Sequence, residues 1–399
     1  MKSIRTLFLA AIFFMGVGSA IFSPLQSYFF IRELGASPAL VGSYLGMTGF
    51  AAILISHCIA VYSDRGVSRR WLIVFSALCG VAAFAGFILI RDFYMLAVIG
   101  LTLMSCVAIG APQLFALASE TFKEGHEAFM GLMRAMVSVA WVVGPPMAFS
   151  LVGLFGFPVT FGILVATSAT VALIALNLPD PVCHGESSSK LEGNAKPDRS
   201  GSRFKLLCAV AGMGLLYSAI NNYTILMPLY IVQTVRLGEW TPGVLFGLTA
   251  AFEIPLMLMA GRISKRVSHQ GQLVLAAFLG GLYYTLFMML ESVYALLPIQ
   301  AIGAASVALS ATAGLQFFQH LMRERLGYAS TLYTNAIVGG MALGAFAGGM
   351  VASVWGYRLA LAANVMLCVA ALGCFYLAAE KNRLPILSLH RRDGLGSTH

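Results

Sequence analysis

The chain has 399 residues, of which 59% are hydrophobic and 10% are charged, and its mean hydropathy is +0.85. This composition excludes an ordinary water-exposed globular protein, because soluble domains carry about 25% charged residues. The net charge of +9 raises nucleic acid binding as a separate possibility. We predict an all-α integral membrane protein and test the charge against the membrane rule for basic residues.

Twelve apolar stretches follow one another along the chain, each with the roughly 20 residues that a helix needs to cross a bilayer. The first six are predicted near residues 6–31, 40–62, 71–91, 94–119, 127–153 and 157–178. The second six are predicted near residues 205–233, 242–263, 272–290, 293–320, 328–354 and 357–379. We therefore expect twelve transmembrane helices in two six-helix bundles, formed by residues 1–179 and 205–380.

A polar segment follows each predicted bundle. Residues 180–204 predict a flexible linker rich in Ser and Gly, and residues 381–399 predict a basic tail. In a chain that crosses the membrane twelve times, every second loop lies on the same side as the N-terminus. That side then carries 20 of the 25 Lys and Arg and the other side carries 4, while Arg134 lies within the membrane. The positive-inside rule then places both termini, the linker and the tail in the cytoplasm. This asymmetry explains the net charge without nucleic acid.

The seven cysteines show neither metal-ligand spacing nor a disulfide framework, and six of them lie in apolar stretches. We expect small packing residues there, and we expect no metal and no cofactor. The seven histidines are scattered, and His57 has no evident activating partner. A membrane-embedded acyltransferase, which needs an activated His or Cys, is therefore a remote alternative, and we predict that the protein is not an enzyme.

The two predicted bundles repeat weakly at an offset of 200 residues. Five positions agree after the second and eighth spans: Ala60, Arg65, Val67, Ser68 and Val74 match Ala260, Lys265, Val267, Ser268 and Val274. Parallel repeats joined by a central linker are typical of transporters whose substrate lies midway between the halves.

The fifth predicted span carries an arginine within an apolar segment that ends in a double proline, MRAMVSVAWVVGPPMAF (133–149). Arg134, Ser138, Trp141 and Pro145 share one face of a helix because they recur at i, i+4, i+7 and i+11. A charge within a membrane faces a bundle interior or an aqueous cavity and has a partner. Two partners stay open: Glu120 would make a structural clamp, and Glu253 would make a gate between the halves.

Glu253 lies eleven residues into its span, about 16 Å deep and near the middle of a membrane core of about 30 Å. A carboxylate held away from water is suited to bind and release a proton. Proton coupling or gating is one hypothesis for Glu253, and a structural role is the alternative. We predict that Arg134→Ala and Glu253→Gln each abolish transport.

Neutral amides also lie within the predicted spans, where they could bind hydroxyl groups of a ligand. The candidates for substrate contact are Gln113, Asn221, Asn222, Gln316 and Asn335, together with Arg134 and the aromatic ring of Trp141. Amides paired with an aromatic ring suit a neutral polyhydroxylated ligand, because C–H faces of sugars stack on rings. The alternative is that the amides hold neighbouring helices together.

Several segments resemble a known family. SDRGVSRR (63–70) is similar to the loop motif of the major facilitator superfamily, with Asp64 at a charged position to which that family gives a gating role. PQLFALASE (112–120), EIPLMLMAG (253–261), LYTNA (332–336) and the segment around Arg134 resemble bacterial sugar efflux transporters.

The resemblance implies export of sugars or glycosides through the bacterial inner membrane, driven by proton antiport. It also implies that the fifth and eighth spans pack together between the halves. The expected partners are a sugar or glycoside, protons and the lipid bilayer, and we expect a monomer.

A multidrug exporter of the same superfamily is the second transport hypothesis. The spans are rich in adaptable apolar side chains, since the chain has 27 Phe and 19 Met. Competition between a labelled sugar and hydrophobic cations would separate the two hypotheses.

Overall fold

The computed structural model describes residues 2–63, 68–122, 126–179, 200–263, 267–322 and 326–378, and within these ranges it contains helices and loops but no strand. The first half has α1 (Lys2–Arg32), α2 (Pro38–Ser63), α3 (Arg69–Leu89), α4 (Phe93–Ile99), the π-helical turn η1 (Gly100–Met104), α5 (Ser105–Val107), α6 (Gly110–Thr121) and α7 (His126–Leu176). The second half has α8 (Ser200–Leu229), the π-helical turn η2 (Tyr230–Thr234), α9 (Thr241–Ile263), α10 (His269–Met289), α11 (Val293–Leu321) and α12 (Leu326–Leu377).

The two longest helices each contain two membrane spans. A helix rises about 1.5 Å per residue, so the 51 residues of α7 and the 52 of α12 exceed twice the depth of a bilayer core of about 30 Å. Each of these two helices turns at a glycine: Gly156 of α7 has φ 79° and Gly356 of α12 has φ 80°. A left-handed φ costs glycine little, and it lets the chain reverse direction there.

Nine helices of the described ranges are long and apolar enough to cross a membrane. Two of the nine are the double-length helices α7 and α12. A further helix, α2, has 26 residues and contacts α12, and its side chains are described only in part. The protein is therefore a multi-pass membrane protein, and its helices are consistent with the twelve predicted spans.

The internal repeat extends to the helix boundaries. The two ends of α3 and α10 differ by 200 residues, and the turns at Gly156 and Gly356 differ by the same number. The linker and tail boundaries at 180–204 and 381–399 stay predictions, because most of those residues lie outside the described ranges. The helix α8 already begins at Ser200.

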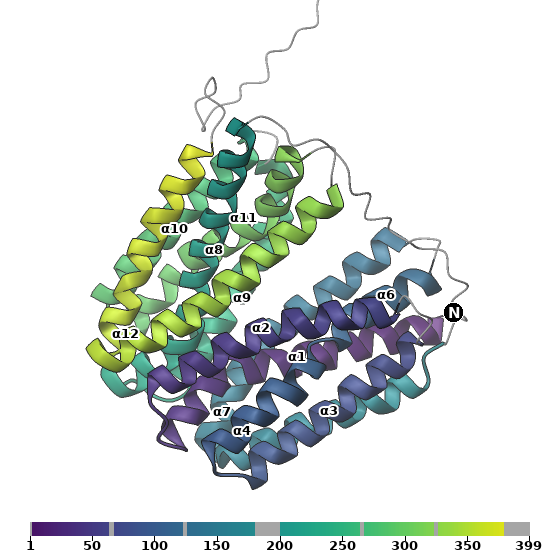
Figure 1. Cartoon of the computed structure of the whole chain (residues 1–399). Coiled ribbons are helices and arrows are strands. Elements are labelled where there is room, and N and C mark those ends of the chain that lie inside the picture. Colours follow the sequence, from purple (N-terminus) through teal and green to yellow (C-terminus); the bar gives the residue numbers. More distant parts are fainter. Residues whose placement is uncertain are drawn as a thin grey trace, which may run out of the picture.

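The halves form two helical bundles that touch at one end (Figure 1). They separate toward the other end, where α1 begins. We call these the contact end and the divergent end. The loop after α1 (33–37) and the loop before α9 (235–240) lie at the contact end, because α1 and α8 start at the divergent end and run away from it.

Candidate functional site

The first crossing between the halves joins α2 to α12 through small residues. Cβ atoms added to Gly42 and Gly49 would lie 2.8 Å from the Cα of Gly349 and 3.2 Å from the Cβ of Ala342. Small residues of this kind let membrane helices approach closely, since van der Waals packing is the main attraction between them. The α2–α12 contact is therefore specified by the sequence.

The second crossing joins α7 to α9 and has the same form. Added Cβ atoms at Gly243 and Gly247 would lie 2.7 Å from the carbonyl oxygen of Pro145 and 2.8 Å from that of Val142. The expectation that the fifth and eighth spans pack together is confirmed, because these segments are α7 and α9. The double proline lies within this crossing.

Polar contacts also join the halves at the contact end. The hydroxyl of Ser27 on α1 donates to the carbonyl oxygen of Ile225 on α8 at 2.7 Å. Beyond it, the guanidinium of Arg32 forms an ion pair with Glu239 in the loop before α9, and it also donates to the Tyr28 hydroxyl. This cluster closes the contact end on its outer side.

At the divergent end, Glu120 is bound by Arg69 and not by Arg134, whose pairing with Glu120 is one of the two that the sequence leaves open. Arg69 Nε contacts Glu120 Oε1 at 2.7 Å, and Arg69 Nη1 donates to Gln113 Oε1 at 3.0 Å. These three residues join α3 to α6 within the first half. In this structure Glu120 is thus part of a clamp that uses Arg69, and Gln113 belongs to the same network.

Arg134 and Glu253 lie at nearly the same level on facing helices. At the α7–α9 crossing, each step of four residues forward on α9 is matched by four residues backward on α7, from Gly243 beside Pro146 to Gly247 beside Val142. Continued to the divergent end, this antiparallel register puts the two charged residues about two residues, or roughly 3 Å, apart in height.

Neither charge has an ionic partner within the part of the chain that the structure describes. Among the described residues, none forms an ion pair with Arg134 or Glu253, and the Arg134 side chain is exposed. Arg134 lies on the α7 face that contains Pro145, which contacts α9 at the crossing. The pairing with Glu253 stays a prediction for a conformation in which the divergent end closes.

Glu253 faces side chains of its own half. It lies one helical turn after Thr249, whose hydroxyl donates to Gln300 on α11 at 2.8 Å. Tyr217 on α8 interacts electrostatically with both Glu253 and Tyr333. Glu253 is half-buried near the Tyr217 phenol of α8, which is a neutral hydrogen-bonding neighbour.

The side chains of the two α8 asparagines form hydrogen bonds to the neighbouring helix α12 and do not point into a cavity. Asn222 is 2% exposed, and its Nδ2 donates to the carbonyl oxygen of Ala360 and to Asn364 Oδ1 at 3.0 and 2.8 Å. Asn221 is half-buried and donates to the carbonyl oxygen of Met341 at 2.7 Å. Both contacts fit the packing alternative for these amides, and the Asn222 side chain has no room for a ligand in this state.

The remaining candidates lie on accessible faces. Asn335 is exposed on α12. It lies seven residues, or two helical turns, before Ala342 and therefore on the same face of α12, which contacts α2 nearer the contact end. Gln316 is exposed on α11, and Trp141 is half-buried on the Arg134 face of α7. Their substrate contacts stay predictions. Asp64 lies outside the described residues.

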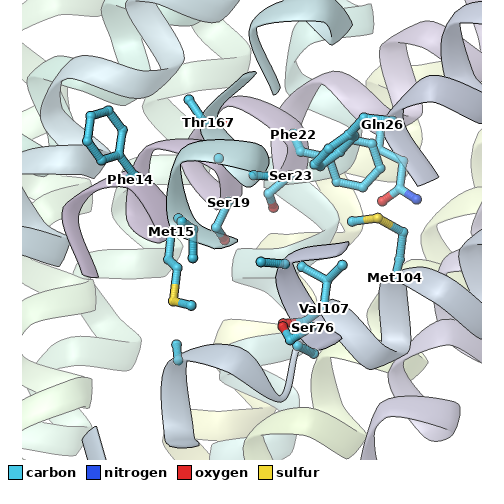
Figure 2. A pocket seen from close by; sticks show the side chains of 17 residues that line it. Phe14, Met15, Ser19, Phe22, Ser23, Gln26, Ser76, Met104, Val107 and Thr167 are labelled. Atoms are coloured by element: carbon cyan, nitrogen blue, oxygen red, sulfur yellow. The ribbon is translucent and has the colours of Figure 1, made fainter. Parts of the chain in front are cut away.

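The sequence hypothesis missed a pocket inside the first half. A cavity of about 440 Å³ lies between α1, α3, the η1 to α6 segment and the second span of α7. Figure 2 shows Ser19, Ser23, Gln26 and Phe22 of α1 around it, with Met104 and Val107 opposite. Scattered serines on an apolar helix gave no signal, because their meaning depends on which neighbours leave space beside them.

The sequence of this chain is similar to known membrane proteins. Residues 8–337 match the Major Facilitator Superfamily. Sugar efflux transporter A of Dickeya chrysanthemi is 34% identical over 378 residues, which are 92% of this chain and 94% of that protein. The chain belongs to the sugar efflux transporter family of the Major Facilitator Superfamily. The resemblance expected from the sequence segments is confirmed.

Other relatives agree with this family. Sugar efflux transporter A of Escherichia coli K12 is 34% identical over 361 residues, covering 90% of this chain and 91% of that protein. Among solved structures, the nucleoside transporter NupG has a TM-score of 0.79 at 13% identity, covering 94% of this chain and 98% of that one. These proteins carry transporter names, and the family is one of transporters rather than enzymes, so the acyltransferase alternative is excluded.

Proposed function

We propose that this chain exports sugars or glycosides from the cytoplasm across the bacterial inner membrane, in exchange for protons. One observation carries the proposal: 34% identity along nearly the whole length to proteins named sugar efflux transporters. The likeness covers the helices at both crossings, so it includes the parts that would move during transport. It favours a sugar exporter over the multidrug alternative.

The conformation fits one stage of alternating access. The positive-inside rule assigns the divergent end to the cytoplasm, because α1 begins there and the predicted basic loops share that face. On this assignment the halves diverge on the cytoplasmic side (Figure 1) and are held together toward the outer side by the two crossings and the Arg32–Glu239 pair. A sugar would enter from the cytoplasm in this state.

Arg134 and Glu253 form the proposed coupling pair. Closing the divergent end brings α7 toward α9, where the two residues share a level. An ion pair needs the ionised carboxylate, so forming it releases any proton that Glu253 carries to the cytoplasmic side. After the sugar leaves outward, a proton from outside neutralises Glu253 and breaks the pair, which lets the cytoplasmic end reopen.

The proposed substrate contacts are accessible side chains of α7, α11 and α12. Trp141 offers a ring for a sugar C–H face, while Gln316 and Asn335 offer amides to hydroxyl groups. Asn221 can join them only if its bond to Met341 breaks. Gln113 and Asn222 are bound to protein groups in this state and take no part in this stage.

Counterflow in proteoliposomes tests the function directly. Vesicles loaded with an unlabelled sugar should accumulate the labelled sugar, and an imposed pH gradient should drive uphill movement. A panel of monosaccharides, disaccharides and methyl glycosides identifies the substrate, and hydrophobic cations serve as competitors. Failure of every saccharide, with transport of a cation, would replace this proposal by the multidrug alternative.

A further inference from the structure

The wall that α1 gives to the pocket of the first half includes two accessible serines. On α1, Gly16 and Ala20 pack against α7, and Gln26 Nε2 donates to the Tyr44 hydroxyl of α2 at 2.7 Å. Ser19 and Ser23 lie on the helix face between these two contacts, and both are exposed. The pocket is therefore accessible at these two serines, on the face of α1 between its contacts with α2 and α7.

The second half has an equivalent place, which its packing identifies. Gly16 and Ala20 of α1 contact Ala140 and Gly144 of α7, whereas Gly214 and Ser218 of α8 contact Gly340 and Gly344 of α12. These contacts align α8 with α1 at an offset of 198 residues, while α7 and α12 keep the offset of 200.

By this alignment, Leu216 corresponds to Gly18, and Tyr217 corresponds to Ser19. Leu216 is fully buried, and a Cβ added to Gly280 would meet its Cδ1 at 3.7 Å. At the corresponding glycine of the first half, Gly80, the three atoms nearest to an added Cβ belong to Ser168 and Val107 and not to α1. The larger side chains of α8 thus fill the place that stays open beside α1.

The lining of the pocket combines apolar walls with hydroxyl groups. Phe22 and Phe84 are nearly buried and contact each other edge to face, with ring centroids 5.2 Å apart. Among the described residues, neither Ser19 nor Ser23 has a hydrogen-bond partner. The amide of Gln26 directs its nitrogen to Tyr44 and keeps its oxygen as an acceptor.

This lining suits a pyranose ring, whose C–H faces are apolar and whose hydroxyls need donors and acceptors. The volume of about 440 Å³ lies within the range of about 300–1,000 Å³ that is usual for small-molecule sites. We infer that this pocket of the first half binds one ring of the transported saccharide, with Gly18 keeping it open and Ser19 and Ser23 binding ring hydroxyls. The inference rests on the proposed sugar transport.

Filling the pocket tests the inference. Gly18→Leu introduces the side chain that fills the equivalent place in the second half, and its Cβ would meet only Thr167 Oγ1, at 3.9 Å. The matched control is Gly162→Leu, because an added Cβ there meets nothing within 4 Å. In counterflow with the saccharide that the wild type carries, Gly18→Leu should raise KM about tenfold or more, and Gly162→Leu should behave as wild type.

A second variant guards against misfolding of the first. The double substitution Ser19→Ala and Ser23→Ala removes two hydroxyl groups without adding volume, and it should raise KM about tenfold. Wild-type KM in Gly18→Leu overturns the inference. If Gly18→Leu fails to insert, wild-type KM in the double variant overturns it instead.

The two proposals fail in different ways. A wild-type protein that carries no saccharide contradicts the proposed function and removes this inference with it. A wild-type protein that carries a saccharide with unchanged KM in both pocket variants contradicts the inference alone.

Discussion

The two halves have the same arrangement of helices but differ in the side chains that fill the space between them. In the second half, a chain of polar side chains joins the four helices α8 to α11: Tyr223 bonds to Tyr283 at 2.6 Å, Tyr283 to Gln300 at 3.0 Å, and Thr249 to Gln300 at 2.8 Å. In the first half, small residues of α1 leave a pocket instead. The repeat supplies the two crossings, and the side chains that break the repeat supply the proposed site.

The two charges of the proposed coupling pair also break the repeat. Arg134 corresponds to Asn335 at an offset of 201 residues, and Glu253 corresponds to Ala52 at the same offset. Each charge therefore occurs once, although its helix occurs twice. One half provides the cation and the other provides the acid, so that the proposed pair can form only between the halves.

Removing either charge should have the largest effect. Arg134→Ala or Glu253→Gln leaves the other group without its proposed partner in the closed state, which costs about 3–5 kcal/mol for a buried pair. Uphill transport driven by a pH gradient should fall by at least about 100-fold in either variant. The measurement is the initial rate of sugar movement in proteoliposomes at matched protein content.

The matched controls are Arg358→Ala and Glu291→Gln, which change exposed residues of the second half. They should transport as the wild type does. Wild-type rates in both Arg134→Ala and Glu253→Gln would remove the coupling pair from the account.

Enlarging a glycine at either crossing should have the next largest effect. Gly42→Leu and Gly243→Leu place a side chain within 3 Å of the backbone of the other half. Overpacking of this kind costs about 1–3 kcal/mol, which disfavours the contact of the halves and should slow transport about tenfold. Because the crossings are equivalent, the two variants should have similar rates.

The control for the crossings is Gly373→Leu, where an added Cβ meets nothing within 4 Å. Normal transport by Gly42→Leu together with loss in Gly243→Leu would show that only one crossing needs the close approach, and the symmetric description would then be wrong.

Asn222→Ala separates packing from ligand binding. The substitution removes the bonds to Ala360 and Asn364, so the free energy of unfolding should fall by about 1–3 kcal/mol. A thermal unfolding scan in detergent measures the change, with Asn177→Ala, at an exposed site, as the control. Unchanged stability with a raised KM would return Asn222 to the substrate site.

The smallest effect is expected at the outer ion pair. Arg32 and Glu239 have side chains that are 41% and 32% exposed, and such a pair contributes up to about 1 kcal/mol. Glu239→Gln should therefore shift the population toward the outward-open state by at most about fivefold. Accessibility of a cysteine introduced at Ser37 in the adjacent outer loop reports the shift, and a change of 100-fold would show that the pair is a dominant gate.

Much of the fold could be predicted from the sequence. Apolar stretches of helical length gave the spans, and the positive-φ turns at Gly156 and Gly356 lie between predicted spans 5 and 6 and between 11 and 12. Arg134 and Glu253 could be selected because charges are rare in such stretches. Their level on facing helices follows only from the register of the α7–α9 crossing.

The partners of polar groups were harder to predict. Glu120 pairs with Arg69 because α3 and α6 are neighbours in space, and Asn222 binds α12 for the same reason. The sequence shows an amide in a span but not which helix lies beside it. The pocket beside Gly18 depends on what α3 and α7 leave unfilled, and no periodic pattern records an empty space.

The most direct test of the central claim is pH-driven transport of the identified saccharide by the wild type and Glu253→Gln in the same proteoliposomes. The account predicts uphill accumulation by the wild type when a pH gradient is imposed, and none by Glu253→Gln. Equal accumulation by both proteins, or a wild type that ignores the gradient, would contradict proton-coupled sugar export through Glu253.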